Sequence, residues 1–284
     1  MTHVTQKIRR EVITGLSKLC LKQASVDYMG LSLKFPMIYG MGRGYIIPRE
    51  FWMLRCLRVF LKRKPGAVLD VGANVGLYLV YLRPVEKSRP YWGVEPNPAC
   101  IFYLHELTRL NHFPNTYIIP FAFSDRKEIR TLFASKRGDS TASMHEFVKR
   151  DRAFSVEMLT FQGDEMIEIL DLNEVAVIKI DVEGAELEVL RGLRKTIEKR
   201  RPYLYCEIWP LPTSDDLTYS EKNRRLRDTY QLLTNLDYCV LGVLPDDRWE
   251  QVKSVNNIGE PYSCEYIFSP IEESQNLLNE LSLQ

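Results

Sequence analysis

The stretch AVLDVGANVGLYLVYL, residues 67–82, most constrains what this chain can fold into. It predicts a buried strand from residue 67 to 69, a turn that holds Asp70, Gly72 and Gly76, and an apolar helix. A strand that feeds a glycine-containing turn and a helix is how doubly wound sheets bind nucleotide-like cofactors. Glycine lets the backbone approach a ligand where a Cβ would clash. The stretch therefore predicts an α/β fold with a cofactor site in this turn.

The glycine spacing separates this turn from the dinucleotide-binding fingerprint, G-x-G-x-x-G. If Gly72 is taken as the first glycine, Asn74 and Leu77 stand at the other two glycine positions. The turn instead has the pattern D-x-G-x-x-x-G, with Asp70 just ahead of the first glycine. A carboxylate there would repel a pyrophosphate and suits a cationic ligand.

The next strand, Tyr91–Val94, ends in Glu95 and is followed by Pro-Asn-Pro. Asn97 can cap a helix whose first residue is Pro98 and which we expect to run to about Asn111. Glu95 then lies at the carboxyl edge of the sheet, where ligands bind in this architecture. A carboxylate there can accept both hydroxyls of a ribose, from an adenosyl ligand or from NAD. The alternative is an acid that only interacts with the helix dipole.

A second stretch that indicates a strand followed by a turn and a helix is VAVIKIDVEGAE, residues 175–186. Val175–Ile180 predicts a buried parallel strand because it is almost continuously apolar. Asp181 follows at its carboxyl end, beside the expected cofactor site, and Glu183 comes two residues later. Glu186 falls in the first turn of the next helix, where capping explains it better than it explains Asp181. Lys179 is a charge inside the apolar run and needs a partner or an exit to solvent.

The remaining elements continue the alternation of strands and helices. Further strands are expected over residues 116–122, 126–133, 156–161, 203–208, 238–244 and 262–268. Further helices are expected over residues 7–21, 49–62, 163–169, 186–201 and 220–236. Glu207 ends one of these strands at the same edge as Asp181. We expect residues 1–65 to form a helical and hairpin extension that covers the site, and residues 66–284 to form the cofactor-binding domain.

Composition excludes several classes of protein. The 284 residues are 45% hydrophobic, which is ample for a large core. A formal net charge of +1 gives no electrostatic reason to expect nucleic acid as a partner. The six cysteines include no C-x-x-C pair, which argues against a zinc site and a disulfide framework. Because no apolar run could span a bilayer and residues 1–10 are polar, we expect a soluble cytoplasmic protein.

The helix expected over residues 7–21 is amphipathic, with Ile8, Val12 and Leu16 on one face. It could pack on the main domain, form a homodimer with a second subunit, or attach to an anionic membrane surface. The sequence leaves these three alternatives open.

Three motifs carry a family resemblance in their order along the chain. They are VLDVGANVG (residues 68–76), VEPNP (residues 94–98) and KIDVEGAELEVLRG (residues 179–192). With them, residues 66–210 resemble the FkbM-type S-adenosylmethionine-dependent methyltransferases. The resemblance implies a Rossmann-like class I methyltransferase fold, with a seven-stranded, mostly parallel sheet flanked by helices. It also implies S-adenosyl-L-methionine as the cofactor and methylation of an oxygen, often a sugar hydroxyl.

The resemblance also assigns roles to residues. The turn after the first strand would hold the methionine portion of the cofactor, Glu95 the ribose, and the backbone near residues 122–124 the adenine. Asp181 would lie nearest the methyl group. In full, the expected cofactor-binding residues are Asp70, Gly72, Ala73, Asn74, Gly76, Glu95, Asn97, Ala122, Ser124 and Asp181.

Methyl transfer from a sulfonium is an in-line displacement, so the protein mainly positions donor and acceptor. The acceptor hydroxyl loses a proton, which makes a general base useful. The catalytic candidates Asp181, Glu183 and Glu207 stand at strand ends that face one mouth. His145, in the loop before Glu146, is a further candidate for the base. The three carboxylates could instead hold a divalent cation, although their spacing establishes no metal site.

The sequence also bears on three alternative functions. Nucleic-acid methylation is disfavoured by the near-neutral charge and by the absence of a D/N-P-P-Y/F/W segment. A non-catalytic binding protein could keep the fold without turnover, and a nicotinamide oxidoreductase conflicts with the glycine spacing. We expect acceptor contacts from residues 35–49, 137–145 and 209–216, which do not identify the sugar or metabolite.

Overall fold

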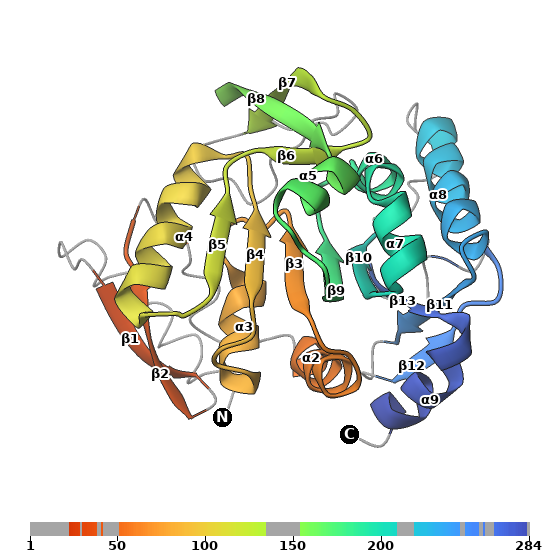
Figure 1. The fold of residues 1–284 in the computed structure, drawn as a ribbon, viewed down its shortest axis with the longest axis horizontal. Helices are drawn as coiled ribbons and strands as arrows, with labels where there is room; N and C mark the ends of the chain where they lie inside the picture. Colours follow the sequence, from red (N-terminus) through yellow and green to blue (C-terminus); the bar gives the residue numbers. More distant parts are fainter. Residues whose placement is uncertain are drawn as a thin grey trace.

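The centre of the molecule is an eight-stranded sheet (Figure 1). The computed structural model describes residues 23–28, 30–38, 41, 51–134, 154–208, 219–244, 248–255, 258 and 264–282. In this part of the chain the strands of the sheet are, in spatial order, β12 (Trp249–Gln251), β11 (Tyr238–Val243), β13 (Glu265–Pro270), β10 (Tyr203–Glu207), β9 (Val175–Ile180), β3 (Ala67–Val71), β4 (Tyr91–Val94) and β5 (Thr116–Ile119).

The five strands from β10 to β5 are parallel, so their carboxyl ends meet at one edge of the sheet. β13 runs antiparallel between β10 and β11, and β12 pairs antiparallel with β11. All six residues of β9 are buried, as expected where helices cover both faces of a sheet. The predicted Rossmann-like α/β fold is confirmed. The described sheet has one strand more than the seven expected, because β12 was not predicted.

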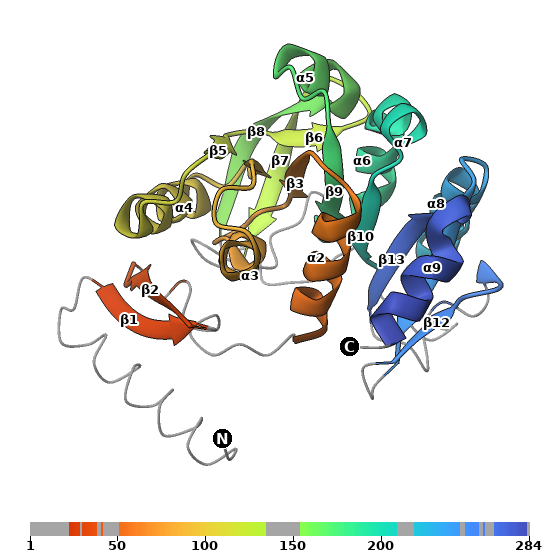
Figure 2. The ribbon, with the colours of Figure 1, turned by 60° about the horizontal axis from the view of Figure 1, so that its bottom comes forward.

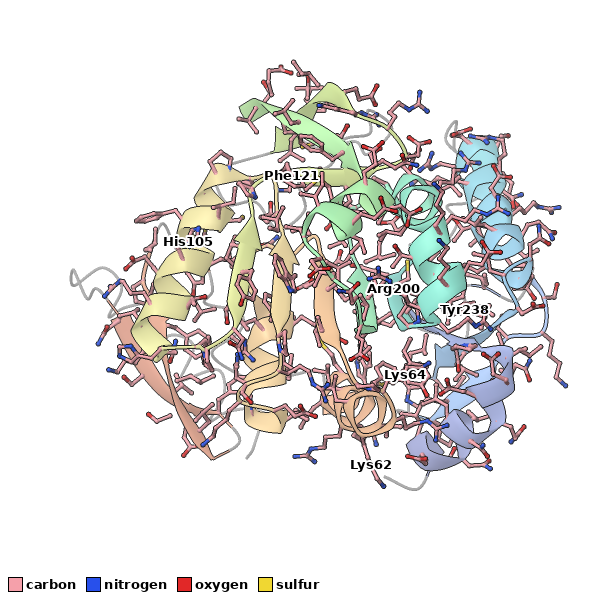
Figure 3. The ribbon with its side chains drawn as sticks, viewed as in Figure 1. Lys62, Lys64, His105, Phe121, Arg200 and Tyr238 are labelled. Atoms are coloured by element: carbon pink, nitrogen blue, oxygen red, sulfur yellow. The ribbon has the colours of Figure 1, made fainter. Side chains whose placement is uncertain are left out.

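Helices cover both faces of the sheet (Figure 2). They are α2 (Phe51–Arg63), α3 (Leu77–Val85), α4 (Pro98–Asn111), α5 (Gly163–Ile169), α6 (Glu186–Gly192), α7 (Arg194–Arg200), α8 (Tyr219–Thr234) and α9 (Ile271–Ser282). One apolar core includes side chains of α2, α3, α4 and α9, and a second core includes those of α5 to α8. Figure 3 shows these side chains packed between the helices and the sheet. Over the described residues, no helix is long and apolar enough to cross a membrane.

A second, three-stranded sheet lies across the carboxyl edge of the first (Figure 1). It consists of β6 (Ala122–Ser124), β8 (Phe154–Gln162) and β7 (Glu128–Ala134), in that spatial order. The single strand predicted over residues 116–122 is therefore wrong, since β5 and β6 belong to different sheets. Pro120 lies between them and lacks the N–H that would continue a ladder.

An N-terminal hairpin, β1 (Gln23–Tyr28) and β2 (Leu31–Pro36), packs at the opposite end of the molecule. The Asn111 side chain accepts from the backbone N–H of Lys34 and donates to its carbonyl, both at 2.7 Å. Asn111 ends α4, whose first turn lies at the carboxyl edge, so the hairpin is remote from that edge. The covering role predicted for residues 1–65 does not fall to this hairpin. The helix predicted over residues 7–21 lies outside the described residues.

Side chains that accept backbone N–H groups explain where two of the helices begin. The Asn97 side chain accepts from the N–H of Ala99 at 3.0 Å, so α4 begins at Pro98 as predicted. The single helix predicted over residues 186–201 is wrong, because α6 and α7 are separate helices. The buried Asp164 carboxylate accepts from the N–H groups of Lys195 and Thr196 at 2.9 and 2.8 Å, and thereby caps α7.

Candidate active site

The turn after β3 lies between the ends of β4 and β9 and contacts both. The N–H groups of Gly72 and Ala73 both donate to the carbonyl of Val94, at 2.9 and 3.1 Å. Gly72 has a φ of +80°, and a Cβ built on it would lie 1.9 Å from the carbonyl oxygen of Asp181. Only glycine fits this position, because both the backbone conformation and the available space exclude a side chain. The turn and the end of β9 are therefore in direct backbone contact.

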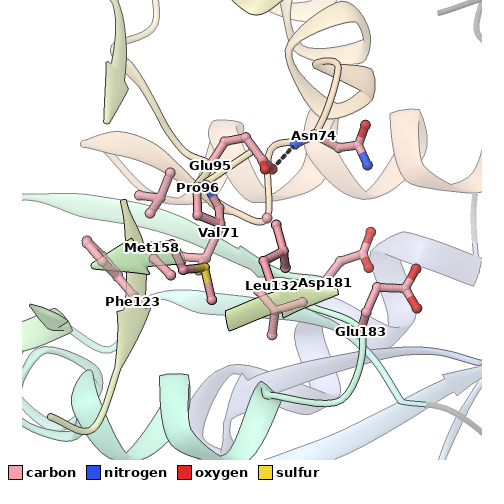
Figure 4. Close-up of a pocket in the computed structure, with 13 residues that line it drawn as sticks. Val71, Asn74, Glu95, Pro96, Phe123, Leu132, Met158, Asp181 and Glu183 are labelled. Atoms are coloured by element: carbon pink, nitrogen blue, oxygen red, sulfur yellow. Dashed lines mark hydrogen bonds between the residues drawn. The ribbon is translucent and has the colours of Figure 1, made fainter. Parts of the chain in front are cut away.

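Glu95 lies at the end of β4, where its carboxylate is held by backbone N–H groups. Its Oε2 accepts from the N–H of Asn74 and its Oε1 from that of Asn97, both at 2.8 Å. Figure 4 shows the first of these bonds at the rim of the pocket. Burial raises the pKa of Glu95 to about 7, although the backbone hydrogen bonds favour the ionised form. Each oxygen keeps a further lone-pair direction for a ligand.

Lys179 has the partners that a charge inside an apolar strand needs. Its Nζ donates to the carbonyl of Gly72 at 2.7 Å and lies 3.1 Å from Asp70 Oδ1 and 3.3 Å from Asp181 Oδ2. Burial would lower the pKa of Lys179, but the carboxylates of Asp181 and Asp70 outweigh burial and raise it. Asp70 is fully buried and also accepts from the hydroxyl of Tyr91 at 2.5 Å. Lys179 thus ties the glycine turn to both carboxylates.

Asp181 and Glu207 end the neighbouring strands β9 and β10 and share a hydrogen bond between their side chains. Burial, followed by the negative charge of Asp181, raises the pKa of Glu207 well above its ordinary value. Glu207 therefore keeps its proton near neutral pH and donates it toward Asp181. Glu183 lies beside Asp181 at the pocket (Figure 4). Within the described ranges, no group of three or more His, Cys, Asp or Glu side chains could hold a metal ion.

The opposite side of the pocket is apolar. Phe123 on β6, Leu132 on β7 and Met158 on β8 line it. In Figure 4, Phe123 and Met158 lie across from Asp181 and Glu183, and Leu132 lies between the two pairs. These three residues were not among the predicted site residues. The strands that carry Leu132 and Met158 were expected, but no local signal indicates that β7 and β8 fold back over the carboxyl edge.

The predicted site residues divide into two groups. Those that line the pocket are Gly72, Asn74, Glu95, Ala122, Asp181 and Glu183. Those that do not line it are Asp70, Ala73, Gly76, Asn97, Ser124 and Glu207. The carbonyl of Ser124 abuts α6, where a Cβ on Gly192 would lie 1.9 Å from it. His145 and the acceptor loops predicted at residues 137–145 and 209–216 lie outside the described residues.

Comparison with known families gives one match, to a model described as the methyltransferase FkbM domain. It matches residues 70–239, which is more than half of the chain and includes both motif-bearing strand ends.

Curated relatives each match about half of the chain. The hexuronic acid methyltransferase AglP of Haloferax volcanii is 27% identical over 163 residues, which cover 52% of this chain and 62% of the relative. Methyltransferase 1 of Beauveria bassiana is 23% identical over 164 residues, which cover 52% of this chain and 66% of the relative. The chain thus covers less than two thirds of the length of either relative.

The solved structures that are similar to this chain include methyltransferase FkbM from Methylobacillus flagellatus KT. It is 20% identical, with a TM-score of 0.43, and the match covers 72% of this chain and 43% of that one.

Proposed function

This chain belongs to the FkbM methyltransferase family, and from that premise we propose that it transfers a methyl group from S-adenosylmethionine to a hydroxyl of a sugar or small metabolite. The observation that carries the proposal is the pocket at the ends of β3, β4 and β9. In it, a carboxylate held by two backbone N–H groups, Glu95, and an aspartate at a strand end, Asp181, line one cavity.

The residues of the pocket fit S-adenosylmethionine. Glu95 has one free acceptor direction on each oxygen, which suits the two hydroxyls of a ribose. Phe123, Leu132 and Met158 offer an apolar surface for an adenine ring. Asp181 contributes negative charge to the same pocket, and a positive sulfonium is favoured near it. When bound, the cofactor supplies a methyl carbon that a nucleophilic oxygen can attack.

The residues of the chain then position the acceptor and move its proton. With the cofactor bound, a hydroxyl placed in line with its methyl group would give up its proton to Asp181. Lys179, 3.3 Å from Asp181, orients that carboxylate. Glu207 holds a proton of its own and gives Asp181 a second hydrogen-bond partner. Glu183 is the alternative base, since it lines the pocket beside Asp181.

A sugar as the acceptor is supported by the match to a relative named a hexuronic acid methyltransferase. The proposal is therefore that the acceptor is a carbohydrate hydroxyl, or a hydroxyl of comparable size on a small metabolite.

The test is transfer of label from methyl-tritiated S-adenosylmethionine to a panel of neutral sugars, hexuronic acids, RNA and DNA. We expect label in a carbohydrate fraction and at least about 100-fold less with Asp181→Asn, as for loss of a general base. Glu250→Gln, an exposed acid on the edge strand β12, is the control and should keep full activity. Label in nucleic acid, or equal transfer by Asp181→Asn, would contradict the proposal.

A further inference from the structure

We propose that Arg225 on α8 is a positioning residue that holds the loop of residues 181–185 in the shape the pocket requires. The geometry stands independently, whereas its consequence for cofactor binding rests on the proposed function. Three consecutive residues of the loop, Asp181, Val182 and Glu183, line the pocket. The position of this loop therefore decides the shape of one side of the pocket.

The loop has a backbone conformation that needs support. Glu183 has a φ of +55° and Gly184 a φ of +104°, so two successive residues lie at positive φ. For the non-glycine residue this conformation is unfavourable, and it persists where neighbouring groups hold it in place.

Side chains from two different helices hold the two backbone polar groups of Gly184. The carboxylate of Glu186, in the first turn of α6, accepts the N–H of Gly184 at 2.9 Å. The Nη2 of Arg225, on α8, donates to the carbonyl of Gly184 at 2.9 Å. Glu186 also accepts from the N–H of Val182. The loop is thus held by the carboxylate of Glu186 on α6 and by the guanidinium of Arg225 on α8.

Arg225 is itself held rigidly by Glu188 on α6. Its Nη1 donates to Glu188 Oε1 at 2.8 Å, and its Nη2 pairs with Glu188 Oε2. Both side chains are only 12% exposed. A two-pronged guanidinium–carboxylate pair of this kind fixes direction as well as distance, and a lysine cannot reproduce it. Arg225 can therefore present one N–H to Gly184 in a fixed direction.

The same helix pair contains a second ion pair that serves as a matched control. Arg191 on α6 lies 3.3 Å from Asp228 on α8, and both side chains are more exposed, at 45% and 36%. Among the described residues, neither Arg191 nor Asp228 has a hydrogen bond to the loop of residues 181–185. Loss of this pair weakens the contact between α6 and α8 without releasing Gly184.

The experiment compares Arg225→Met, Arg225→Lys, Glu188→Gln and Asp228→Asn in the full chain. Hydrogen exchange of the backbone amides of residues 182–184 is measured without ligand, and calorimetry measures S-adenosylmethionine binding. We expect Arg225→Met to speed exchange in the loop by about 10-fold, as for loss of a charge-assisted hydrogen bond. Its cofactor dissociation constant should rise by at least about 5-fold, since the loop lines the pocket.

The remaining variants separate positioning from general stability. Arg225→Lys should lie between the wild type and Arg225→Met, and Glu188→Gln should speed loop exchange less than Arg225→Met, because the bond to Gly184 remains. Asp228→Asn should leave both readouts within about 2-fold of the wild type. If Arg225→Met does not fold, the Arg225→Lys and Glu188→Gln variants carry the test.

Loop exchange within 2-fold of the wild type in the folded Arg225 variants would overturn the proposal. So would faster exchange with unchanged cofactor affinity, or an equal effect of Asp228→Asn. If the wild type binds no S-adenosylmethionine, the proposed function fails, while the exchange measurement still decides whether Arg225 holds the loop.

Discussion

Two carboxylates flank β3 at the carboxyl edge, and they are held in opposite ways. Glu95, after β4, is 6% exposed, and both its oxygens accept backbone N–H groups. Asp181, after β9, has a side chain that is 33% exposed, and its partners are the side chains of Lys179 and Glu207. One acid is fixed by the backbone, and the other belongs to a group of ionisable side chains.

The difference indicates different chemistry at the two strand ends. Backbone N–H groups cannot give up a proton, so they fix the direction of Glu95 and leave its free lone pairs for recognition. The side-chain partners of Asp181, unlike backbone N–H groups, can exchange or share a proton with it. We therefore assign recognition to the β4 side of the pocket and proton transfer to the β9 side.

The largest effect is expected where the two sides meet. Gly72→Ala would place a Cβ 1.9 Å from the Asp181 carbonyl, which should cost at least about 4 kcal/mol of unfolding free energy. Gly30→Ala is the matched control, because Gly30 has the same φ of +80° with no atom within 4 Å of the added Cβ. It should cost only about 1 kcal/mol. Urea unfolding measures both, and similar losses would contradict the close contact.

Asp164 is a second acid whose carboxylate accepts backbone N–H groups. It tests whether every acid bound in this way affects cofactor binding, or only Glu95. Asp164 accepts from the backbone of Lys195 and Thr196 and lies outside the pocket lining. Asp164→Ala should lower the unfolding free energy by about 2 kcal/mol, because it leaves α7 without its cap. S-adenosylmethionine affinity should not change. Glu165→Ala, an exposed neighbour, is the control for stability. A loss of cofactor affinity in Asp164→Ala would break the comparison.

The pKa of Glu95, raised by burial to about 7, predicts a pH dependence of binding. In the proposed function the ionised carboxylate accepts ribose hydroxyls, and a carboxyl with this pKa is mostly protonated at pH 6 and mostly ionised at pH 8. Affinity of the wild type for S-adenosylmethionine should therefore rise by up to about 10-fold between these pH values. Titration calorimetry across the range measures this. In Glu95→Gln the dependence should disappear, and a pH-dependent variant would assign it to another group.

The proton on Glu207 predicts a smaller effect, on stability. Its pKa is raised in the folded protein above the ordinary 4.5, so the unfolded chain loses this proton first as pH rises. The stability contributed by the group is present below pH 4.5 and is lost as pH rises toward the folded value.

Glu207→Gln removes this loss, so its melting temperature relative to the wild type should rise by about 3 °C between pH 5 and pH 9. Glu250→Gln should show a constant difference over the same range. A constant difference in Glu207→Gln would show that Glu207 and Asp181 do not share a proton.

Local signals predict much of the fold and the recognition side of the site. The cap formed by Asn97 and Pro98 is local, so α4 begins where the sequence indicates and Glu95 lies at the strand end ahead of it. β9 has its predicted bounds because its apolar run is bounded by Glu174 and Asp181. Long-range pairing is not local, and for this reason the apolar wall at Leu132 and Met158 could not be predicted.

The proton-transfer side depends more on contacts between distant segments. Lys179 could be predicted to need a partner, but its contact with the turn at Gly72 joins residues that are far apart in the sequence. Asp70 was predicted to contact the cofactor, and the structure places it fully buried, 3.1 Å from the Nζ of Lys179 and outside the pocket lining. Arg225, on α8, donates to the carbonyl of Gly184, and nothing in the sequence of α8 indicates this contact.

The most direct test of the assignment of recognition to Glu95 is S-adenosylmethionine binding by calorimetry to the wild type and to Glu95→Ala at pH 8. We predict micromolar binding by the wild type, as is typical of enzyme substrates, and at least about 10-fold weaker binding by the variant. Glu165→Ala should bind like the wild type. Absence of binding by the wild type, or equal binding by Glu95→Ala, would contradict the account.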